Sequence, residues 1–452
     1  MNTPICDFLR EYRESETVRM HMPGHKGKEL TGPEASDLTE IPGADELYRA
    51  RGIILESERN AAELFGTRRT VYSTEGSSLC IRAMLYLAGL RAAEHGIPQR
   101  ILAGRNAHKT LMTAAALLDT DIEWIFPEAE EGLLSCRVTA EKVSEQLKKH
   151  SFMAVYLTTP DYLGHRTGFR EIAEVCHEQG VPLLVDNAHG AYLRFLEEDL
   201  HPMAEGADVC CDSAHKTLPC LTGAAYLHIS GKAPEVFARD AERAMALFAS
   251  TSPSYLILQS LDRVNAELAG TLPGKIRLAA EKNRETKAFL EEKGWKTAGG
   301  EPMKLTLLPK SFGYTGKDVC DLLRQEGVVC EYSDPDCLVM MPSSETGPEA
   351  WNRIRSALEQ IPRREPVRER APGMPAPERV MSVRRAMLSP MERIPVGEAA
   401  GRIMADPCIG CPPAVPPVIA GERISGDAVR LFRYYGITEC AVVRTSCGGQ
   451  SK

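Results

Sequence analysis

The chain has 452 residues, of which 43% are hydrophobic and 26% are charged, a mixture that excludes a disordered chain. Its 54 basic and 62 acidic residues give a formal net charge of −8. No overall positive field therefore draws the protein to nucleic acid or to anionic lipid. The longest uncharged segment that suggests a membrane span, residues 248–261, contains Ser, Thr, Pro and Gln and is shorter than the roughly 18–20 apolar residues required. We expect neither a nucleic-acid partner nor a membrane.

Residues 1–16 carry charges from Asp7 onward and lack an apolar stretch of signal-peptide length. The 14 cysteines show no regular framework, and a chain of this length can bury a core without disulfides. We therefore expect reduced thiols and a cytoplasmic location. Cys408 and Cys411 form the single CxxC pair, and no second pair accompanies it, so we expect no metal.

Apolar segments alternate with helical patterns between about residues 52 and 265. The sequence predicts helices over 77–95, 111–118 and 169–179, and strands over 101–103, 153–158, 181–185 and 224–229. Continuous apolar strands that alternate with helices are typical of a parallel sheet covered on both faces. This pattern predicts an α/β large domain.

A second, smaller α+β pattern follows a long helical stretch over 264–293. It contains predicted strands over 303–308, 328–332 and 337–341 and helices over 316–327 and 349–358. Residues 361–379 hold five prolines and five arginines without periodicity, which indicates a linker. A helical pattern over 396–403, a proline-rich loop over 411–417 and a βαβ-like tail follow. The expected divisions are an N-terminal segment (1–51), a large domain (52–265), a small domain (266–362), a linker (363–379) and a C-terminal domain (380–452).

Two residues near the middle of the chain carry the clearest chemical signal. Asp186 ends a predicted buried strand, where the ligand crevice of an open α/β sheet lies. Lys216 follows the short strand-like VCCD within Ser-x-His-Lys-Thr. Each has a simpler interpretation alone, Asp186 as a helix N-cap and Lys216 as a solvated lysine. Together they match pyridoxal phosphate, because the lysine would form the Schiff base and the carboxylate would keep the pyridine nitrogen protonated.

Two further motifs supply the remaining contacts of such a cofactor. Gly76, Ser77 and Ser78 precede or open a predicted helix, where backbone N–H groups and hydroxyls form a phosphate cup. Simple serine capping is the alternative. His108 follows another predicted strand and is placed to stack on the pyridine ring, although a histidine in this position, taken alone, is more often a packed loop residue.

The chain resembles the ornithine/lysine/arginine decarboxylase family, in its short bacterial form, over nearly its whole length. The resemblance rests on ordered motifs along the chain: HMPGHKG (21–27), DLTEIPG (37–43) with Asp45, AAELFG (61–66), TEGSS, RNAHKT, VDNAHGA, SAHKTLP, STSPSY (250–255), RIP (393–395), GRI (401–403), CPPAVPP and AGE (420–422). It implies a fold-type I pyridoxal-phosphate enzyme. Such an enzyme has a mostly parallel sheet covered by helices, a smaller α+β domain and a C-terminal extension.

The resemblance also implies roles for individual residues. Lys216 would be the Schiff-base lysine, Asp186 the partner of the pyridinium nitrogen, and His189 a neighbour of the ring that helps proton transfer. The family builds its sites at a two-fold interface, which implies a homodimer or a higher homo-oligomer with shared active sites. The ring, phosphate and substrate contacts would come from His108 at the ring, from Ser77, Ser78, Ser213 and His215 at the phosphate, from Thr251 and Ser252 at a neighbouring subunit's phosphate, and from Glu422 at the basic end of the substrate.

The expected reaction is the α-decarboxylation of arginine, lysine or ornithine to its amine and carbon dioxide. An aminotransferase or lyase on another amino acid uses the same fold and the same Asp/Lys pair, so it stays open at this point. An arginine clamp for the α-carboxylate would favour transamination. A catalytically inactive paralogue is disfavoured by the intact Lys216 and Asp186. Departures from the usual family pattern at Glu75, Ala107, Asp161, Asn187 and Tyr192 leave the choice of substrate open.

Overall fold

The computed structural model describes residues 1–128, 133, 135–374, 377–406 and 415–444. Within these residues no helix is both long enough and apolar enough to cross a membrane. Cys408 and Cys411 lie outside the described residues.

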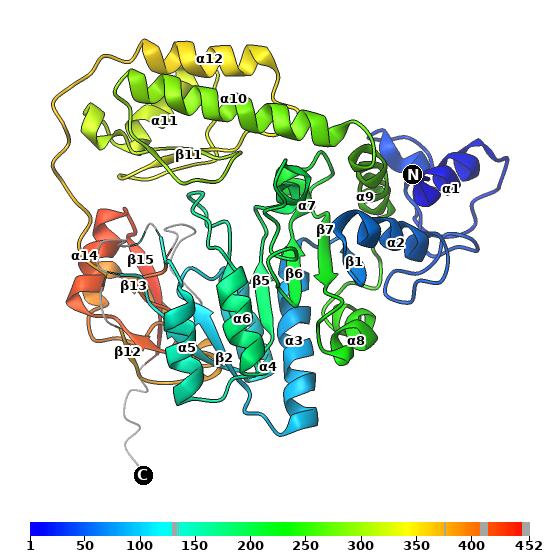
Figure 1. Cartoon of the computed structure of the whole chain (residues 1–452), viewed down its shortest axis with the longest axis horizontal. Helices are drawn as coiled ribbons and strands as arrows, with labels where there is room; N and C mark the ends of the chain where they lie inside the picture. Colours follow the sequence, from blue (N-terminus) through cyan, green and yellow to red (C-terminus); the bar gives the residue numbers. More distant parts are fainter. Residues whose placement is uncertain (129–132, 134, 375–376, 407–414, 445–452) are drawn as a thin grey trace.

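A seven-stranded sheet forms the centre of the large domain (Figure 1). Its strands in spatial order are β1 (Arg69–Ser73), β7 (Ala225–Ile229), β6 (Val209–Asp212), β5 (Leu183–Asp186), β4 (Ala154–Thr158), β2 (Arg100–Gly104) and β3 (Asp121–Ile125). Only β7 runs against its neighbours, and the pairs from β6 to β3 are parallel. The mostly parallel sheet predicted from the sequence is confirmed.

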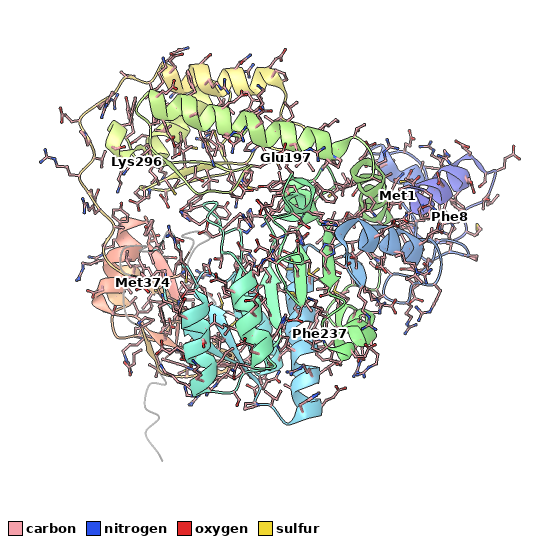
Figure 2. The ribbon with its side chains drawn as sticks, in the orientation of Figure 1. Met1, Phe8, Glu197, Phe237, Lys296 and Met374 are labelled. Carbon is pink, nitrogen blue, oxygen red and sulfur yellow. The ribbon has the colours of Figure 1, made fainter. Side chains whose placement is uncertain are left out.

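Helices cover both faces of this sheet because its strand residues alternate between two cores. Tyr156 and Leu184 pack with α3 (Ser77–His95), α4 (Lys109–Leu118) and α8 (Glu235–Ala246). Val155 and Val185 pack with α5 (Ala140–Lys149) and α6 (Arg170–Glu178) on the other face. Figure 2 draws the side chains that fill these layers, including the fully buried Phe237 of α8.

Further helices complete the N-terminal segment and the large domain. They are α1 (Pro4–Glu14), η1 (Pro33–Ser36), α2 (Ile53–Phe65), η2 (Ala191–Phe195), α7 (Ala214–Thr217) and α9 (Tyr255–Leu268). The buried Asp262 of α9 accepts hydrogen bonds from the backbone N–H groups of Ile5 and Cys6, at 3.0 Å each. This contact ties α1 to the large domain.

The long helix predicted over 264–293 is two helices. The structure ends α9 at Leu268 and begins α10 (Leu272–Glu292) after a short break that contains Gly270. Pro273 stands in the first turn of α10, where its missing N–H costs no hydrogen bond. In Figure 1, α10 runs across the top of the molecule from α9 to the small domain.

The small domain contains a four-stranded sheet in the order β10 (Tyr332–Ser333), β11 (Leu338–Met340), β9 (Leu305–Leu307) and β8 (Thr297–Ala298). With it pack η3 (Pro309–Phe312), α11 (Gly316–Gln325) and α12 (Pro348–Glu359). The strand predicted over 328–332 is wrong for residues 328–331, because β10 begins only at Tyr332. The two predicted helices of this region are confirmed.

The C-terminal region packs against the large domain through Val415 and Leu431, which join the core around α5 and α6. Its elements are β12 (Glu378–Arg379), α13 (Val383–Met387), β13 (Met391–Pro395), η4 (Val396–Glu398), β14 (Glu422–Arg423), α14 (Gly426–Tyr434) and β15 (Glu439–Val443). The predicted βαβ tail is wrong in its pairing, because β14 pairs with β12 and β15 pairs with β13, both antiparallel. The helix predicted over 396–403 is only the single turn η4.

Candidate active site

A cavity of about 390 Å³ lies at the carboxyl ends of the central parallel strands. Thr158 ends β4, Asp186 ends β5 and Ser213 directly follows β6, and all three line the cavity. Parallel strands bring their carboxyl ends to one edge, which is where α/β sheets bind ligands. The lining residues are Glu75, Gly76, Ser77, Ser78, Asn106, Ala107, His108, Lys109, Thr158, Pro160, Tyr162, Asp186, Ala188, His189, Ser213, His215, Lys216, Thr222, Gly223 and Pro416.

Lys216 and His189 meet inside this cavity. Lys216 belongs to the short helix α7, and its Nζ lies 3.1 Å from His189 Nε2. Burial, together with the nearby charges of Lys304 and Lys216, holds the pKa of His189 well below its usual value. The imidazole is therefore neutral near pH 7, and its Nε2 can accept a hydrogen bond from the Lys216 Nζ.

Asp186 is almost completely buried, with 1% of its surface exposed. The Tyr156 hydroxyl donates to its Oδ2 at 3.0 Å, and the backbone N–H of Ala188 donates to its Oδ1 at 3.2 Å. The Cys211 thiol lies 3.7 Å from the same Oδ1. These donors fix the carboxylate at the floor of the cavity, where it can face a cationic ring nitrogen.

The N-terminus of α3 opens onto the cavity beside the hydroxyl groups of Ser77 and Ser213 and the imidazole of His215. Its N-cap, Gly76, has φ of 71° and provides no side-chain cap, so the first N–H groups of a long helix lack an intrahelical partner. A Cβ at Gly76 would meet no atom within 4 Å, so this position borders open space. Ser213 donates to the Ser77 hydroxyl at 2.8 Å, and His215 lines the same wall. This arrangement can hold a phosphate.

His108 forms the N-cap of α4 at another side of the cavity. Its Nδ1 accepts from the backbone N–H of Thr110 at 3.3 Å and lies 2.8 Å from the Thr110 hydroxyl. That hydroxyl donates in turn to Ser78 at 3.2 Å. Burial lowers the pKa of His108. A neutral ring fixed in this way presents a flat surface to an aromatic ligand.

The cavity fits pyridoxal phosphate in its donors and charges. It combines an amine at Lys216, a buried carboxylate at Asp186, and a helix N-terminus with serine hydroxyls. His189 adds a buried Nδ1 to which no described residue is hydrogen-bonded. Nine predicted site residues converge here from separate segments of the chain, with Glu75 beside them: Gly76, Ser77, Ser78, His108, Asp186, His189, Ser213, His215 and Lys216.

Three predicted site residues lie outside the cavity lining. Thr251 and Ser252 are exposed in the loop between α8 and α9. Glu422 is buried, and both of its carboxylate oxygens bind the Arg105 guanidinium, at 2.8 and 2.7 Å. The contacts predicted for these residues with a neighbouring subunit and with the substrate stay predictions.

The departures from the family pattern have varied surroundings. Glu75 and Ala107 line the cavity, whereas Asp161, Asn187 and Tyr192 do not. Asp161 accepts from the backbone N–H groups of Leu163 and His165, at 3.0 and 2.8 Å. It therefore stabilises its own loop. Tyr192 donates to Glu301 in the small domain.

Asn187 belongs to a buried polar cluster behind the cavity. Its amide donates to Asp212 Oδ1 at 2.7 Å, and the other oxygen of Asp212 contacts His201 Nε2 at 2.9 Å and His228 Nε2 at 3.2 Å. The two histidines hold the pKa of Asp212 below its usual value despite its burial. Since Asp212 and Asn187 directly flank Ser213 and Asp186, this cluster fixes the floor of the cavity.

Sequence reasoning missed Tyr162 and Pro416 as lining residues. Tyr162 directly follows Asp161, one of the departures from the family pattern, in the loop after β4. The Tyr162 ring meets the His189 ring edge-on at a centroid distance of 5.4 Å. Pro416 lies far along the chain from the other lining residues, the nearest of which in sequence is Gly223, so no local signal could place it there.

Comparison with known proteins agrees with this geometry. The family model for the major domain of Orn/Lys/Arg decarboxylases matches residues 3–289, and the model for the C-terminal domain of the same family matches residues 371–443. The chain belongs to the Orn/Lys/Arg decarboxylase family. This assignment confirms the predicted activity class, a decarboxylase of a basic amino acid, and the resemblance read from the motifs.

Relatives of known name cover almost the whole chain. An arginine decarboxylase of Halalkalibacterium halodurans is 30% identical, over 95% of this chain and 93% of that protein. An arginine decarboxylase of Bacillus subtilis is 29% identical, over 94% and 92%. The solved structure of lysine decarboxylase A from Pseudomonas aeruginosa has a TM-score of 0.78 at 16% identity, covering 96% of this chain and 76% of that one. This last likeness confirms the predicted fold-type I architecture.

Proposed function

We propose that this protein binds pyridoxal 5′-phosphate in the described cavity and removes the α-carboxyl group of arginine, lysine or ornithine. The observation that carries the proposal is the convergence of Lys216, Asp186 and the N-terminus of α3 on one cavity. Arginine is favoured among the three substrates, because the near-full-length relatives of named activity are arginine decarboxylases.

The predicted site residues that line the cavity have separate roles in this proposal. Lys216 would hold the cofactor covalently, Ser77, Ser78, Ser213 and His215 would bind its phosphate, and His108 would pack on its ring. Bound there, the cofactor supplies an electron sink for the carbon–carbon bond that breaks. Asp186 would keep the ring nitrogen protonated, because an opposite charge favours the protonated form.

The same residues can return a proton to the substrate Cα after carbon dioxide has left. Lys216 Nζ carries the proton, and the neutral His189 lies 3.1 Å behind it as acceptor. A neutral imidazole can accept from Lys216 without adding positive charge to the cavity. We therefore propose Lys216 as the proton donor and His189 as the residue that orients it.

An aminotransferase is the alternative that shares these residues. Such an enzyme retains the α-carboxylate and needs a cation to bind it. No arginine occurs among the described residues that line the cavity. Arg194 of η2 donates to the Leu64 carbonyl at 3.1 Å and pairs with Asp199. These contacts favour decarboxylation.

We further propose a homodimer or higher homo-oligomer in which Thr251 and Ser252 reach the site of the neighbouring subunit. Both side chains are exposed in the single chain, as such a role requires. The cytoplasmic location predicted from the cysteine usage stays a prediction.

The experiment that tests the reaction is product identification. Purified protein, saturated with pyridoxal phosphate, is incubated separately with arginine, lysine and ornithine, and the products are measured together with carbon dioxide. The proposal expects agmatine, cadaverine or putrescine in amounts equal to the carbon dioxide released. A 2-oxo acid formed without carbon dioxide, with the amino group passed to an added 2-oxo acid acceptor, would establish the aminotransferase alternative.

A further inference from the structure

A second carboxylate lies close to the cavity on the side of the small domain. Tyr162, which lines the cavity, donates from its hydroxyl to Glu331 Oε1 at 3.0 Å. The two residues come from different domains, since Tyr162 follows β4 of the large sheet and Glu331 immediately precedes β10 of the small one. The loop after β4 rises toward the small domain in Figure 1.

Glu331 is available to a ligand. It is exposed, and among the residues that the structure describes only Tyr162 donates a hydrogen bond to its carboxylate, leaving Oε2 without a donor. The nearby Lys304 is fully buried, and its Nζ donates to the Asp161 carbonyl at 2.7 Å and not to Glu331. A carboxylate with one oriented oxygen and one open oxygen can accept a cationic donor group.

The carboxylates of the large domain near the cavity have other partners. Asp186 is held at the cavity floor by Tyr156 and Ala188. Glu75 directly precedes the proposed phosphate cup, and its Oε1 accepts from the Ser250 backbone N–H at 2.7 Å. A substrate cation bound to Asp186 or Glu75 would displace the cofactor or lie against it. Neither carboxylate can therefore receive the far end of the substrate side chain.

Two buried carboxylates, Asp161 and Glu422, are similarly engaged. Asp161 accepts two backbone N–H groups of its own loop and lies 2.8 Å from His165 Nδ1. Glu422 is occupied by Arg105. Among the described carboxylates beside the cavity, Glu331 is thus the one whose position and open oxygen suit the distal group of a basic amino acid.

The arrangement also has the right order in space. Lys216 contacts His189, the His189 ring meets Tyr162, and Tyr162 holds Glu331. This series leads from the reacting nitrogen to the rim of the cavity along the small domain. A long unbranched substrate side chain attached at the Lys216 end could extend along Tyr162 to reach the rim.

We infer that Glu331, oriented by the Tyr162 hydroxyl, binds the cationic end group of the substrate and makes the enzyme selective for a basic amino acid. This inference rests on the proposed function. It assigns substrate recognition to the small domain, in a residue that the sequence analysis did not single out.

The test compares a charged substrate with its neutral analogue in holoenzyme variants. In the wild type, kcat/KM is measured for arginine and for its neutral analogue citrulline, and likewise for lysine and norleucine. The selectivity ratio is kcat/KM for the charged substrate divided by kcat/KM for its neutral analogue. Glu331→Gln should lower kcat/KM for the preferred charged substrate about 10- to 100-fold, through KM, as expected for one lost charge-assisted contact. The value for the neutral analogue should stay within about twofold, so the selectivity ratio falls.

The control variants separate this role from a structural one. Glu326→Gln removes an exposed carboxylate of the same domain and should change neither ratio. Tyr162→Phe keeps the ring against His189, removes the hydroxyl donor, and should reduce the selectivity ratio less than Glu331→Gln does. The absorption spectrum of bound cofactor should be the same in all three variants.

Two results would overturn the inference. One is an unchanged selectivity ratio in Glu331→Gln, and the other is an equal loss for charged and neutral substrates. A wild type that decarboxylates no basic amino acid would instead refute the proposed function itself. The two failures are therefore distinguishable.

Discussion

Arg105 and Glu422 form a bidentate ion pair that joins the large domain to the C-terminal domain in a buried environment. The guanidinium carbon of Arg105 lies 5.2 Å from the centroid of the Trp124 ring, and its Nε donates to the Pro416 carbonyl at 3.1 Å. Since Pro416 lines the cavity, this pair holds a loop of the C-terminal domain at the active site. Arg105 also lies three residues before His108. We propose that Glu422 positions the site through Arg105.

Glu422→Gln is expected to destabilise the protein, because it leaves the buried Arg105 without its carboxylate. Removing one member of a buried pair costs about 3–5 kcal/mol, and the retained amide oxygen places this variant near the lower end. Chemical denaturation of the wild type, the variant and the exposed control Glu398→Gln measures the loss. Unchanged stability with a raised KM for the basic amino acid would contradict this positioning role and support direct substrate recognition.

Asp186→Asn should retain cofactor but lose most activity. The opposing carboxylate favours the protonated ring by about 1–3 pKa units, so kcat should fall about 10- to 1000-fold. Cofactor content is measured by absorbance and phosphate analysis, and kcat by carbon dioxide release. A variant that turns over near the wild-type rate would exclude this role for Asp186.

The buried carboxyl of Glu58 should make the stability of the folded protein depend on pH in a specific way. Burial raises the pKa of this carboxyl to about 8, while the Tyr72 backbone N–H, which donates to it at 2.9 Å, opposes the shift. Between about pH 4.3, the pKa of this carboxyl in the unfolded chain, and pH 8, the folded protein binds one proton more than the unfolded chain. The contribution of Glu58 to stability is therefore complete below about pH 4.3 and is lost as the pH rises through 8.

Glu58→Gln should remove this part of the pH dependence. Relative to the wild type, the variant should gain stability from pH 5 to pH 8, by about 2–4 kcal/mol in total. Denaturation curves at several pH values measure the difference, and Glu63→Gln, exposed on the same helix, is the control. Parallel pH profiles for wild type and Glu58→Gln would show that Glu58 ionises normally.

Site residues whose positions depend on a nearby strand or helix boundary could be predicted from the sequence. Asp186 and Lys216 each follow a buried strand, and strand ends of a parallel sheet must meet at one edge, so their proximity followed from the pattern. Ser77 and Ser78 were predictable because a helix begins there. All of these positions need only a strand or helix boundary, which nearby residues determine.

The long-range contacts could not be predicted in this way. The Arg105–Glu422 pair joins residues 317 apart, and the Tyr162–Glu331 bond joins residues 169 apart. Their formation depends on how whole domains pack. The edge strand β3 was missed for a different reason: its sequence DIEWI mixes charged with apolar residues, because one side of an edge strand meets solvent.

A shared active site predicts complementation between two defective variants. Lys216→Ala lacks the lysine, and a Thr251→Ala/Ser252→Ala double variant lacks the proposed contacts to the neighbouring phosphate. When the two are unfolded, mixed and refolded together, one site of each mixed dimer receives intact copies of both parts. Activity above the sum of the separate variants is expected. The absence of any gain, with mixed dimers demonstrated by tagged pull-down, would place Thr251 and Ser252 outside a shared site.

Chemical labelling of the cofactor-binding lysine tests directly whether Lys216 holds the cofactor. Purified protein is saturated with pyridoxal phosphate, reduced with borohydride, digested and analysed by mass spectrometry. We expect a phosphopyridoxyl group on Lys216, and loss of the absorbance at roughly 410–430 nm on reduction, as the cofactor's chemistry requires. A label on another lysine, with Lys216 unmodified, would contradict the assignment of this cavity as the active site.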